Sequence, residues 1–199
     1  MRIVPITESL ASRKPVLLQH GLGTNGLVWM LRSDEDLAST PVAMMEAGYD
    51  VWLGNFRGSV YSLEHENLSS ESDTAYWDFS WAEIGLYDLP AMVGYIYEKA
   101  NERDVTYIGS SQATTAMFYG LAHNDAGILA DKLTEVLALA PCFLFDHESP
   151  LNPIDNYVDY TLVDTAMEEL GIDHINRKEN GISKKTLIHF EQNAFTDRF

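Results

Sequence analysis

The sequence predicts a single α/β domain in which a mostly parallel sheet carries helices on both faces. One reason is that short runs rich in β-branched and aromatic residues alternate along the chain with segments of helical periodicity. A second reason is that glycine-punctuated turns follow several of these runs, as expected where strands lead into helices. The predicted strands are residues 15–19, 49–53, 105–108 and 135–141.

Length and charge narrow the range of functions. The chain has 199 residues, of which 46% are hydrophobic, and this suits one domain with a substantial core. Its net charge of -17 repels phosphate backbones, so no nucleic-acid partner is expected. No metal ion and no cofactor is expected, and the single cysteine, Cys142, leaves no internal disulfide. Neither a membrane span nor a signal-peptide core is predicted, so the compartment stays open.

The first part of the chain is expected to begin with a short strand over residues 1–6. Residues 15–19 read as a fully buried strand, because nothing in this run alternates between apolar and polar residues. A glycine-rich loop over 20–26 follows it. A helix is predicted over 36–47, because its apolar pattern stops at Gly48.

The middle of the chain contains a second helix signal. Ser80 is expected to cap this helix, with Glu83 three residues later as its capping-box partner. Pro90 lies inside the helical pattern, so it predicts either a kink or a new helical start after Asp88.

The chain is expected to divide into three parts. Residues 1–141 form the core of the domain. Residues 142–182 lose the alternating pattern among prolines, acids and glycines, and we interpret them as a lid inserted over the carboxyl edge of the sheet. Residues 183–199 return to the core as a helix that Ser183 caps.

The strand at 105–108 runs through Gly109 and Ser111 directly into a helix. A serine at the tip of such a junction is forced out of the sheet with its hydroxyl exposed, an arrangement called a nucleophile elbow. Ser111 is therefore the candidate nucleophile, at the centre of a G-x-S-x-G frame whose last position is Ala113. The alternative is an ordinary turn that happens to carry two serines, Ser110 and Ser111, because short motifs often match by chance.

Acyl transfer at this serine would need N–H donors for a developing oxyanion. We assign one donor to Leu22, which follows Gly21 in the glycine-rich loop, and the second to Gln112, just after the candidate nucleophile. His20 is expected to order the loop through its ring nitrogens and not to act as an acid or base. Arg57 either braces neighbouring loops or anchors an anionic substrate.

Several sequence blocks occur in one order along the chain: LQHGL (18–22), AGYDVWLGNFRG (47–58), WDFSW (77–81), YDLPA (87–91), GSSQA (109–113) and LALAP (137–141). In this combination they resemble the acid lipase family of α/β-hydrolases, the group that includes gastric and lysosomal acid lipases. The resemblance covers most of residues 1–141, and 185–199 look like the family's helix after the lid.

The resemblance implies a partial α/β-hydrolase fold with a short lid, Ser111 as nucleophile, and Leu22 with Gln112 as oxyanion-hole donors. It also implies neutral lipid esters, triacylglycerol or steryl ester, as substrates, and a lysosomal or secreted location. Two elbow positions depart from the family pattern, which has histidine at the position of Ser110 and glycine at that of Ala113.

The acid and the histidine of the triad follow the nucleophile along the chain in such hydrolases, and the family places both beyond the lid. We expect both to be missing here, because none of the later histidines is well placed to be the base: His123, His147, His174 and His189. His147 is the best placed, but its neighbour Asp146 would point the other way on an extended segment.

Two functions are therefore considered. The first is a lipid ester hydrolase whose missing triad residues come from outside this chain, for example from a second chain that completes the sheet and the triad. The alternative is a catalytically inactive, lipase-like subunit of a larger assembly. The chain by itself is expected to be inactive, because a serine without its base is a poor nucleophile.

Overall fold

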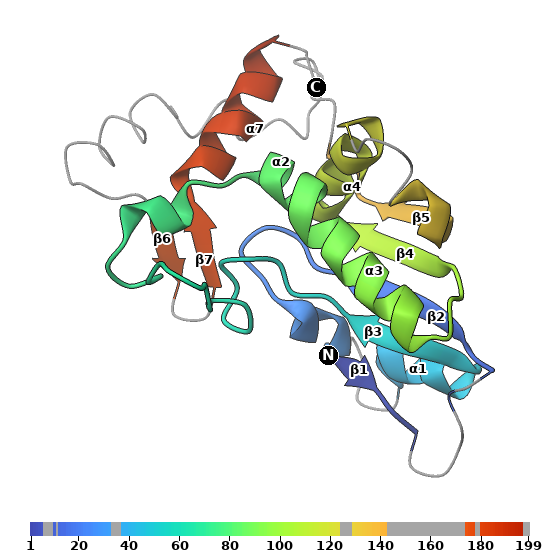
Figure 1. Ribbon diagram of the computed structural model, residues 1–199. Helices are drawn as coiled ribbons and strands as arrows, with labels where there is room; N and C mark the ends of the chain where they lie inside the picture. The colour runs from blue at the N-terminus through green and yellow to red at the C-terminus, as the bar shows by residue number, and fades with distance from the viewer. Residues whose placement is uncertain are drawn as a thin grey trace.

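A five-stranded sheet organises the fold, in the order β1-β3-β2-β4-β5 (Figure 1). The computed structural model describes residues 1–5, 10, 12–32, 37–123, 129–142, 174–177 and 180–196. The strands of the sheet are β1 (Arg2–Ile3), β2 (Lys14–Gln19), β3 (Tyr49–Leu53), β4 (Val105–Ser110) and β5 (Leu133–Leu139).

The sheet is mixed but mostly parallel, as predicted. β1 pairs with β3 in the antiparallel sense, whereas the pairs β3 with β2, β2 with β4 and β4 with β5 are parallel. The register sets Val16 opposite Val51 on one side and opposite Thr106 on the other. β2 is the central strand and is buried on both faces, which is why its run of apolar residues does not alternate.

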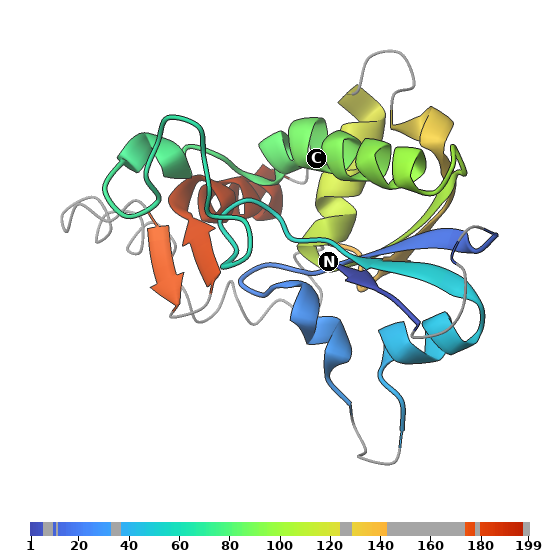
Figure 2. The same ribbon diagram turned by 60° about the horizontal axis from the view of Figure 1, so that its bottom comes forward.

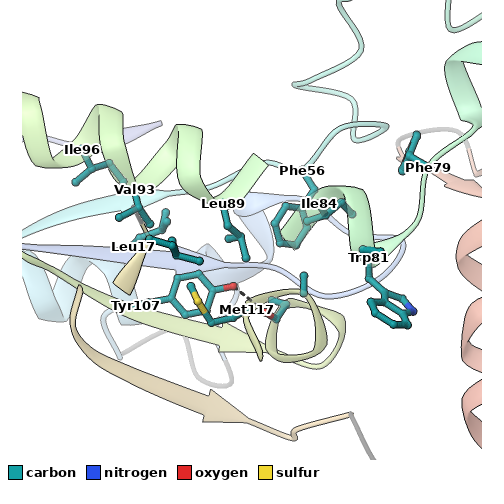
Figure 3. Close-up of a cluster of buried hydrophobic side chains, with 14 of the residues drawn as sticks. Leu17, Phe56, Phe79, Trp81, Ile84, Leu89, Val93, Ile96, Tyr107 and Met117 are labelled. Atoms are coloured by element: carbon teal, nitrogen blue, oxygen red, sulfur yellow. Dashed lines mark hydrogen bonds between the residues drawn. The ribbon is translucent and has the colours of Figure 1, made fainter. Parts of the chain in front are cut away.

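Helices cover both faces of the sheet, which confirms the predicted architecture (Figure 2). On one face, α3 (Leu89–Lys99) and α4 (Gln112–His123) pack on a core that includes Leu17, Val93, Tyr107 and Met117 (Figure 3). On the other face, η1 (Gly26–Met30) and α1 (Thr40–Glu46) supply Trp29, Met44 and Met45, which pack against a smaller buried cluster: Val16, Leu18, Val51 and Leu53.

The prediction of a helix over 36–47 was wrong at its start. α1 begins at Thr40, with Ser39 as N-cap residue and Pro41 in the first turn. Proline has no N–H, so it fits the first turn, where the N–H groups have no partner within the helix, but not the helix interior. Pro41 therefore fixes the start of α1 close to itself.

The predicted capping box at Ser80 is confirmed. Ser80 Oγ accepts a hydrogen bond from Ala82 N at 3.1 Å, and Glu83 Oε2 accepts one from Ser80 N at 2.7 Å. This helix follows the short η2 (Thr74–Trp77) and begins as α2 (Trp81–Glu83). It continues as a π-helical stretch, η3 (Ile84–Asp88), and α3 then starts at Leu89 with Pro90 in its first turn. Asp88 and Leu89 both keep right-handed helical backbone angles, so the helix is continuous and the new start considered for Pro90 is not present.

Two glycines bring the π-helical stretch and α4 into backbone contact. A Cβ atom added to Gly120 would lie 2.5 Å from Gly85 O, and one added to Gly85 would overlap the carbonyl oxygen of Ala116. Real Cβ atoms do not approach backbone oxygens this closely. Only glycine fits at both positions, and the elbow helix α4 is held directly against its neighbour.

The chain after the core returns as a hairpin and a helix. β6 (His174–Arg177) and β7 (Asn180–Ser183) pair in the antiparallel sense, and α7 (Lys184–Thr196) follows. Ser183 Oγ accepts a hydrogen bond from Thr186 N at 3.1 Å, so the predicted cap is present. The lid predicted over 142–182 lies mostly outside the described residues, and the division of the domain at 141 and 182 stays a prediction.

Lys185 ties α7 to the capping box. Its Nζ lies 2.9 Å from Glu83 Oε1 and 3.2 Å from Asp78 Oδ1. Burial by itself would raise the pKa of Glu83, but the hydrogen bonds from Lys185 and Ser80 outweigh it and lower this pKa to about 2. Over the described part of the chain, no helix has both the length and the apolar composition needed to cross a membrane.

Candidate active site

Ser111 occupies the junction between β4 and α4 in a strained backbone conformation. Its φ is 56°, in the left-handed region that residues with a side chain rarely adopt. Its N–H donates to Leu139 O at 2.9 Å, and its carbonyl oxygen accepts from Thr114 N at 2.8 Å and from Thr114 Oγ1 at 2.6 Å. The strain persists because these contacts hold the turn on both sides, and strain of this kind gathers at functional sites.

Ala113, the departure at the end of the pentapeptide, is accommodated by Gly109. A Cβ atom added to Gly109 would lie 3.1 Å from Ala113 Cβ and 2.6 Å from Tyr107 Cε1. Tyr107 is fully buried and its hydroxyl donates to Ala113 O at 2.9 Å. Burial raises the pKa of this hydroxyl, so Tyr107 remains a neutral donor. The elbow keeps its shape with alanine at its last position.

The glycine-rich loop lies directly against the candidate nucleophile. A Cβ atom added to Gly21 would lie 3.1 Å from Ser111 Cβ, 3.2 Å from Ser110 O and 3.6 Å from Ser111 Oγ. A side chain at this position would press on the elbow, so glycine is what lets the loop come this close.

The two assigned oxyanion donors meet at one small cavity. Leu22 and Gln112 both line this space of about 20 Å³ beside Gly21. Gln112 is the first residue of α4, so its N–H belongs to the first turn, where no carbonyl of the helix can accept it. The positive end of the helix dipole lies at the same place. Leu22 and Gln112 thus lie on two different segments that meet beside Gly21, and their role as oxyanion donors stays a prediction.

His20 holds the glycine-rich loop to the turn after β3. Its ring is 3% exposed, and its Nε2 accepts a hydrogen bond from Phe56 N at 3.1 Å. The proton therefore sits on Nδ1, which donates to Gly21 O at 2.8 Å. Burial lowers the pKa of His20 to about 4. Both ring nitrogens are engaged in ordering loops, which is the role expected for this histidine.

Arg57 is paired with a carboxylate. Its Nε donates to Asp88 Oδ1 at 2.7 Å, and its backbone N–H donates to Asp88 Oδ2 at 3.0 Å. Its guanidinium also lies over the rings of Phe79, at 5.7 Å, and Tyr87, at 5.9 Å. Of the two roles left open by the sequence, these contacts favour bracing, here through the carboxylate of Asp88.

Cys142 is a site residue that the sequence reasoning missed. Its Sγ lies 3.7 Å from Ser111 Oγ. Its backbone N–H donates to Thr114 Oγ1 at 3.1 Å, and its carbonyl oxygen accepts from Thr115 Oγ1. Its place directly after the last predicted strand could have revealed it. Parallel strands end at the same edge of a sheet, so the residue after that strand lies near the elbow.

The later histidines with described side chains make their contacts elsewhere. His123 Nδ1 lies 3.1 Å from Tyr119 O, and its ring stacks on that of Tyr119 at 4.1 Å. The ring of His189 packs edge-on against Trp81 at 5.4 Å, and burial lowers its pKa. Asp146 and His147 lie outside the described residues, as does the side chain of His174. Where side chains are described, the group found in contact with Ser111 Oγ is a thiol and not an imidazole.

A large cleft in the described part of the molecule lies away from Ser111. It has a volume of about 810 Å³ and is lined by residues between 55 and 79 and by the first turn of α3. Across the same described residues, no group of three or more histidine, cysteine or acidic side chains is arranged to hold a metal ion. The strained turn and the glycine-rich loop meet at Ser111.

Comparison with known proteins points to the same fold. Residues 14–166 match the model of the alpha/beta hydrolase fold family. Triacylglycerol lipase 1 of Arabidopsis thaliana is 33% identical over 183 residues, which covers 92% of this chain and 44% of that protein. Gastric triacylglycerol lipase of Rattus norvegicus is 37% identical over 151 residues, covering 74% of this chain and 36% of that protein.

A third relative extends the similarity to nematodes. Lipase lipl-1 of Caenorhabditis elegans is 43% identical over 130 residues, which covers 65% of this chain and 31% of that protein. The chain thus spans less than half the length of each of these relatives. The match to the family model covers most of the chain, and the lipases agree with the resemblance seen in its sequence blocks. The chain belongs to the alpha/beta hydrolase family and is acid lipase-like within it.

Proposed function

We propose that the protein is a lipid ester hydrolase, a triacylglycerol or steryl ester lipase, with Ser111 as its nucleophile. The observation that carries the proposal is the left-handed backbone of Ser111, at a strand-to-helix junction that faces Gly21. The substrate class is supported by the relatives, two of which are named triacylglycerol lipases.

The proposed reaction runs through an acyl-enzyme. Ser111 Oγ attacks the ester carbonyl carbon while a general base takes its proton, and the carbonyl oxygen becomes an oxyanion. The N–H groups of Leu22 and Gln112 bind this oxyanion, each contributing about 3–4 kcal/mol of transition-state stabilisation in comparable hydrolases. Collapse of the intermediate breaks the ester C–O bond and releases the alcohol, which takes up the proton. Water then attacks the acyl-enzyme, releases the fatty acid and restores Ser111.

The general base and its acid are proposed to come from outside this chain, either from further parts of a longer polypeptide or from a second chain that completes the sheet and the triad. The contacts of His123 with Tyr119, and of His189 with Trp81, support this, because they keep both imidazoles occupied elsewhere.

A fluorophosphonate probe, which reacts with activated serines, tests the proposal. The protein together with whatever completes it is expected to be labelled, Ser111→Ala is expected not to be, and Ser110→Ala serves as the neighbouring control. Labelling that survives in Ser111→Ala would show that another residue is the nucleophile. Absence of labelling in the wild type would favour the inactive, lipase-like subunit, for which the Cys142 thiol at Ser111 Oγ is the supporting observation.

The source of the base has its own test. The chain alone is expected to give no turnover of p-nitrophenyl esters above background, because the base is proposed to come from outside it. Turnover by the chain alone that disappears in His147→Ala would instead place the base at His147, within this chain.

A further inference from the structure

The end of β7 packs on the glycine-rich loop, far away in sequence. Ile182 is 8% exposed, and a Cβ atom added to Gly23 would lie 3.0 Å from Ile182 Cδ1 and 3.5 Å from Ile182 Cγ1. Gly23 has a φ of 65° and directly follows Leu22, the assigned oxyanion donor. The side chain of Ile182 therefore covers one of the two glycines that flank the donor, the one with the left-handed backbone.

Ile182 is itself fixed by contacts that do not involve the loop. Gly181 N donates to Gly58 O at 3.0 Å, and Ser183 Oγ donates to Phe79 O. β7 accordingly lies alongside the segment that follows β3 (Figure 1). Because the residues on both sides of Ile182 are held by hydrogen bonds, its side chain has a fixed position against the glycine-rich loop.

The glycine-rich loop needs such a fixed contact to hold its backbone in one conformation. Glycines at 21 and 23 leave its backbone more conformational freedom than other residues would, and this freedom must be removed for an N–H to point in one direction. On one side, the loop is held by His20 Nδ1 and Thr24 Oγ1, which both donate to Gly21 O, at 2.8 Å and 3.1 Å. The side of the loop that carries Gly23 packs on Ile182.

We propose that Ile182 is a positioning residue that fixes the direction of the Leu22 N–H by confining Gly23. This inference rests on the proposed function, since it gives Leu22 the role of oxyanion donor. Ile182 acts through the loop and does not touch the reacting atoms. The cavity between the loop and β7 is only about 20 Å³, so removing side-chain atoms from Ile182 would give the loop room that it does not have now.

The test compares Ile182→Ala with Ile96→Ala in the active protein, completed by whatever supplies its base. Ile96 is 3% exposed in the core under α3, so the same atoms are removed at a site that is equally buried but not in contact with the loop. Only Ile182→Ala is expected to lower kcat, by about tenfold, with little change in KM, because the lost interaction is made in the transition state.

Two further measurements separate positioning from simple loss of stability. Hydrogen exchange at the amides of residues 21–24 should become faster in Ile182→Ala and stay unchanged in Ile96→Ala. Ile182→Val removes only Cδ1, the atom closest to Gly23, so it should show the same effects at smaller size even if the alanine variant does not fold. Ile182→Leu, which keeps the volume, should restore most of kcat.

The possible outcomes distinguish this inference from the proposed function. If the wild type turns over esters and the Ile182 variants match Ile96→Ala in kcat and in exchange, the inference is wrong and the proposed function stands. If the wild type shows neither turnover nor probe labelling, the proposed function fails. In that case unchanged exchange at residues 21–24 in Ile182→Val overturns the inference, and faster exchange supports its structural part.

Discussion

Acidification is expected to destabilise the fold through His20. Burial lowers the pKa of this ring from 6.5 to about 4. Between these two pKa values the unfolded chain binds a proton at His20 and the folded chain does not. The contribution of neutral His20 to the free energy of unfolding is therefore complete above the ordinary pKa and is lost as the pH falls toward the pKa of the folded state. The cause is visible in the contacts, because a proton on Nε2 would face the N–H of Phe56 at 3.1 Å.

The size of the loss follows from the two pKa values. The difference in proton binding amounts to about 2 kcal/mol at about pH 5 and about 3 kcal/mol at about pH 4. At still lower pH the folded state binds the proton too, and His20 adds no further loss. A loss of this size is a large fraction of the stability of a typical domain.

Urea unfolding of the wild type and of His20→Gln, at a series of pH values between about 7 and 4, measures the effect. Glutamine does not titrate, whereas every other group, including His189, is the same in both proteins. The stability advantage of the wild type over the variant should therefore shrink by about 2 kcal/mol between about pH 7 and pH 5. An advantage that stays constant over this range would refute the neutral, buried state assigned to His20.

The other predictions concern Cys142, Gly85 and Glu83. Alkylation of Cys142 by iodoacetamide should block fluorophosphonate labelling of Ser111, because Sγ lies 3.7 Å from Oγ, and in Cys142→Ala the reagent should make no difference. Gly85→Ala should lower the free energy of unfolding by about 2 kcal/mol or more, because its methyl group meets the backbone of α4. Gly94→Ala is the control, because a Cβ atom there meets only the end of a lysine side chain at 3.6 Å, and it should be neutral or stabilise the fold by up to about 1 kcal/mol. Equal effects of the two substitutions would contradict this reasoning. Glu83→Gln should cost at most about 1 kcal/mol at neutral pH, since the pair is partly exposed. That cost should vanish as the pH falls from 4.5 toward 2, because the pKa of Glu83 in the folded state is about 2. Thermal unfolding of both proteins over this pH range measures the cost, and a cost that persists at the acid end would contradict the lowered pKa.

The strands and the elbow could be predicted because burial alone determines their pattern. The run at 49–53 is β3 with the same bounds, and the run at 15–19 is β2 but for one residue. Both lie inside the sheet with helices on its two faces, so most of their positions are buried and apolar. The position of Ser111 follows from the same geometry, since a strand that leads directly into a helix leaves little choice for the residue between them.

The contacts that complete the site could not be predicted from local patterns. His20 and Phe56 are 36 residues apart, and their hydrogen bond depends on how two loops meet at the edge of the sheet. The packing of Ile182 on Gly23 joins segments from opposite ends of the chain. Periodicity reports which face of an element is buried and carries no information on which loop lies against it.

The start of α1 and the π-helical stretch were missed for a more local reason. A helix over 36–47 would place Pro41 in its interior, whereas a proline is better tolerated in the first turn, where the structure has it. The extra residue that turns 84–88 into a π-helix leaves the sequence pattern of its neighbours almost unchanged, so no periodicity separates it from α-helix.

The contact between Gly109 and Ala113 also has a consequence for how members of this fold family are recognised in genomes. The methyl group of Ala113 fits at the end of the pentapeptide because Gly109, four residues earlier, has no side chain to meet it. A search string that demands glycine at both ends of the pentapeptide would discard this protein. One that asks for glycine before the serine and any small residue after it would retain it.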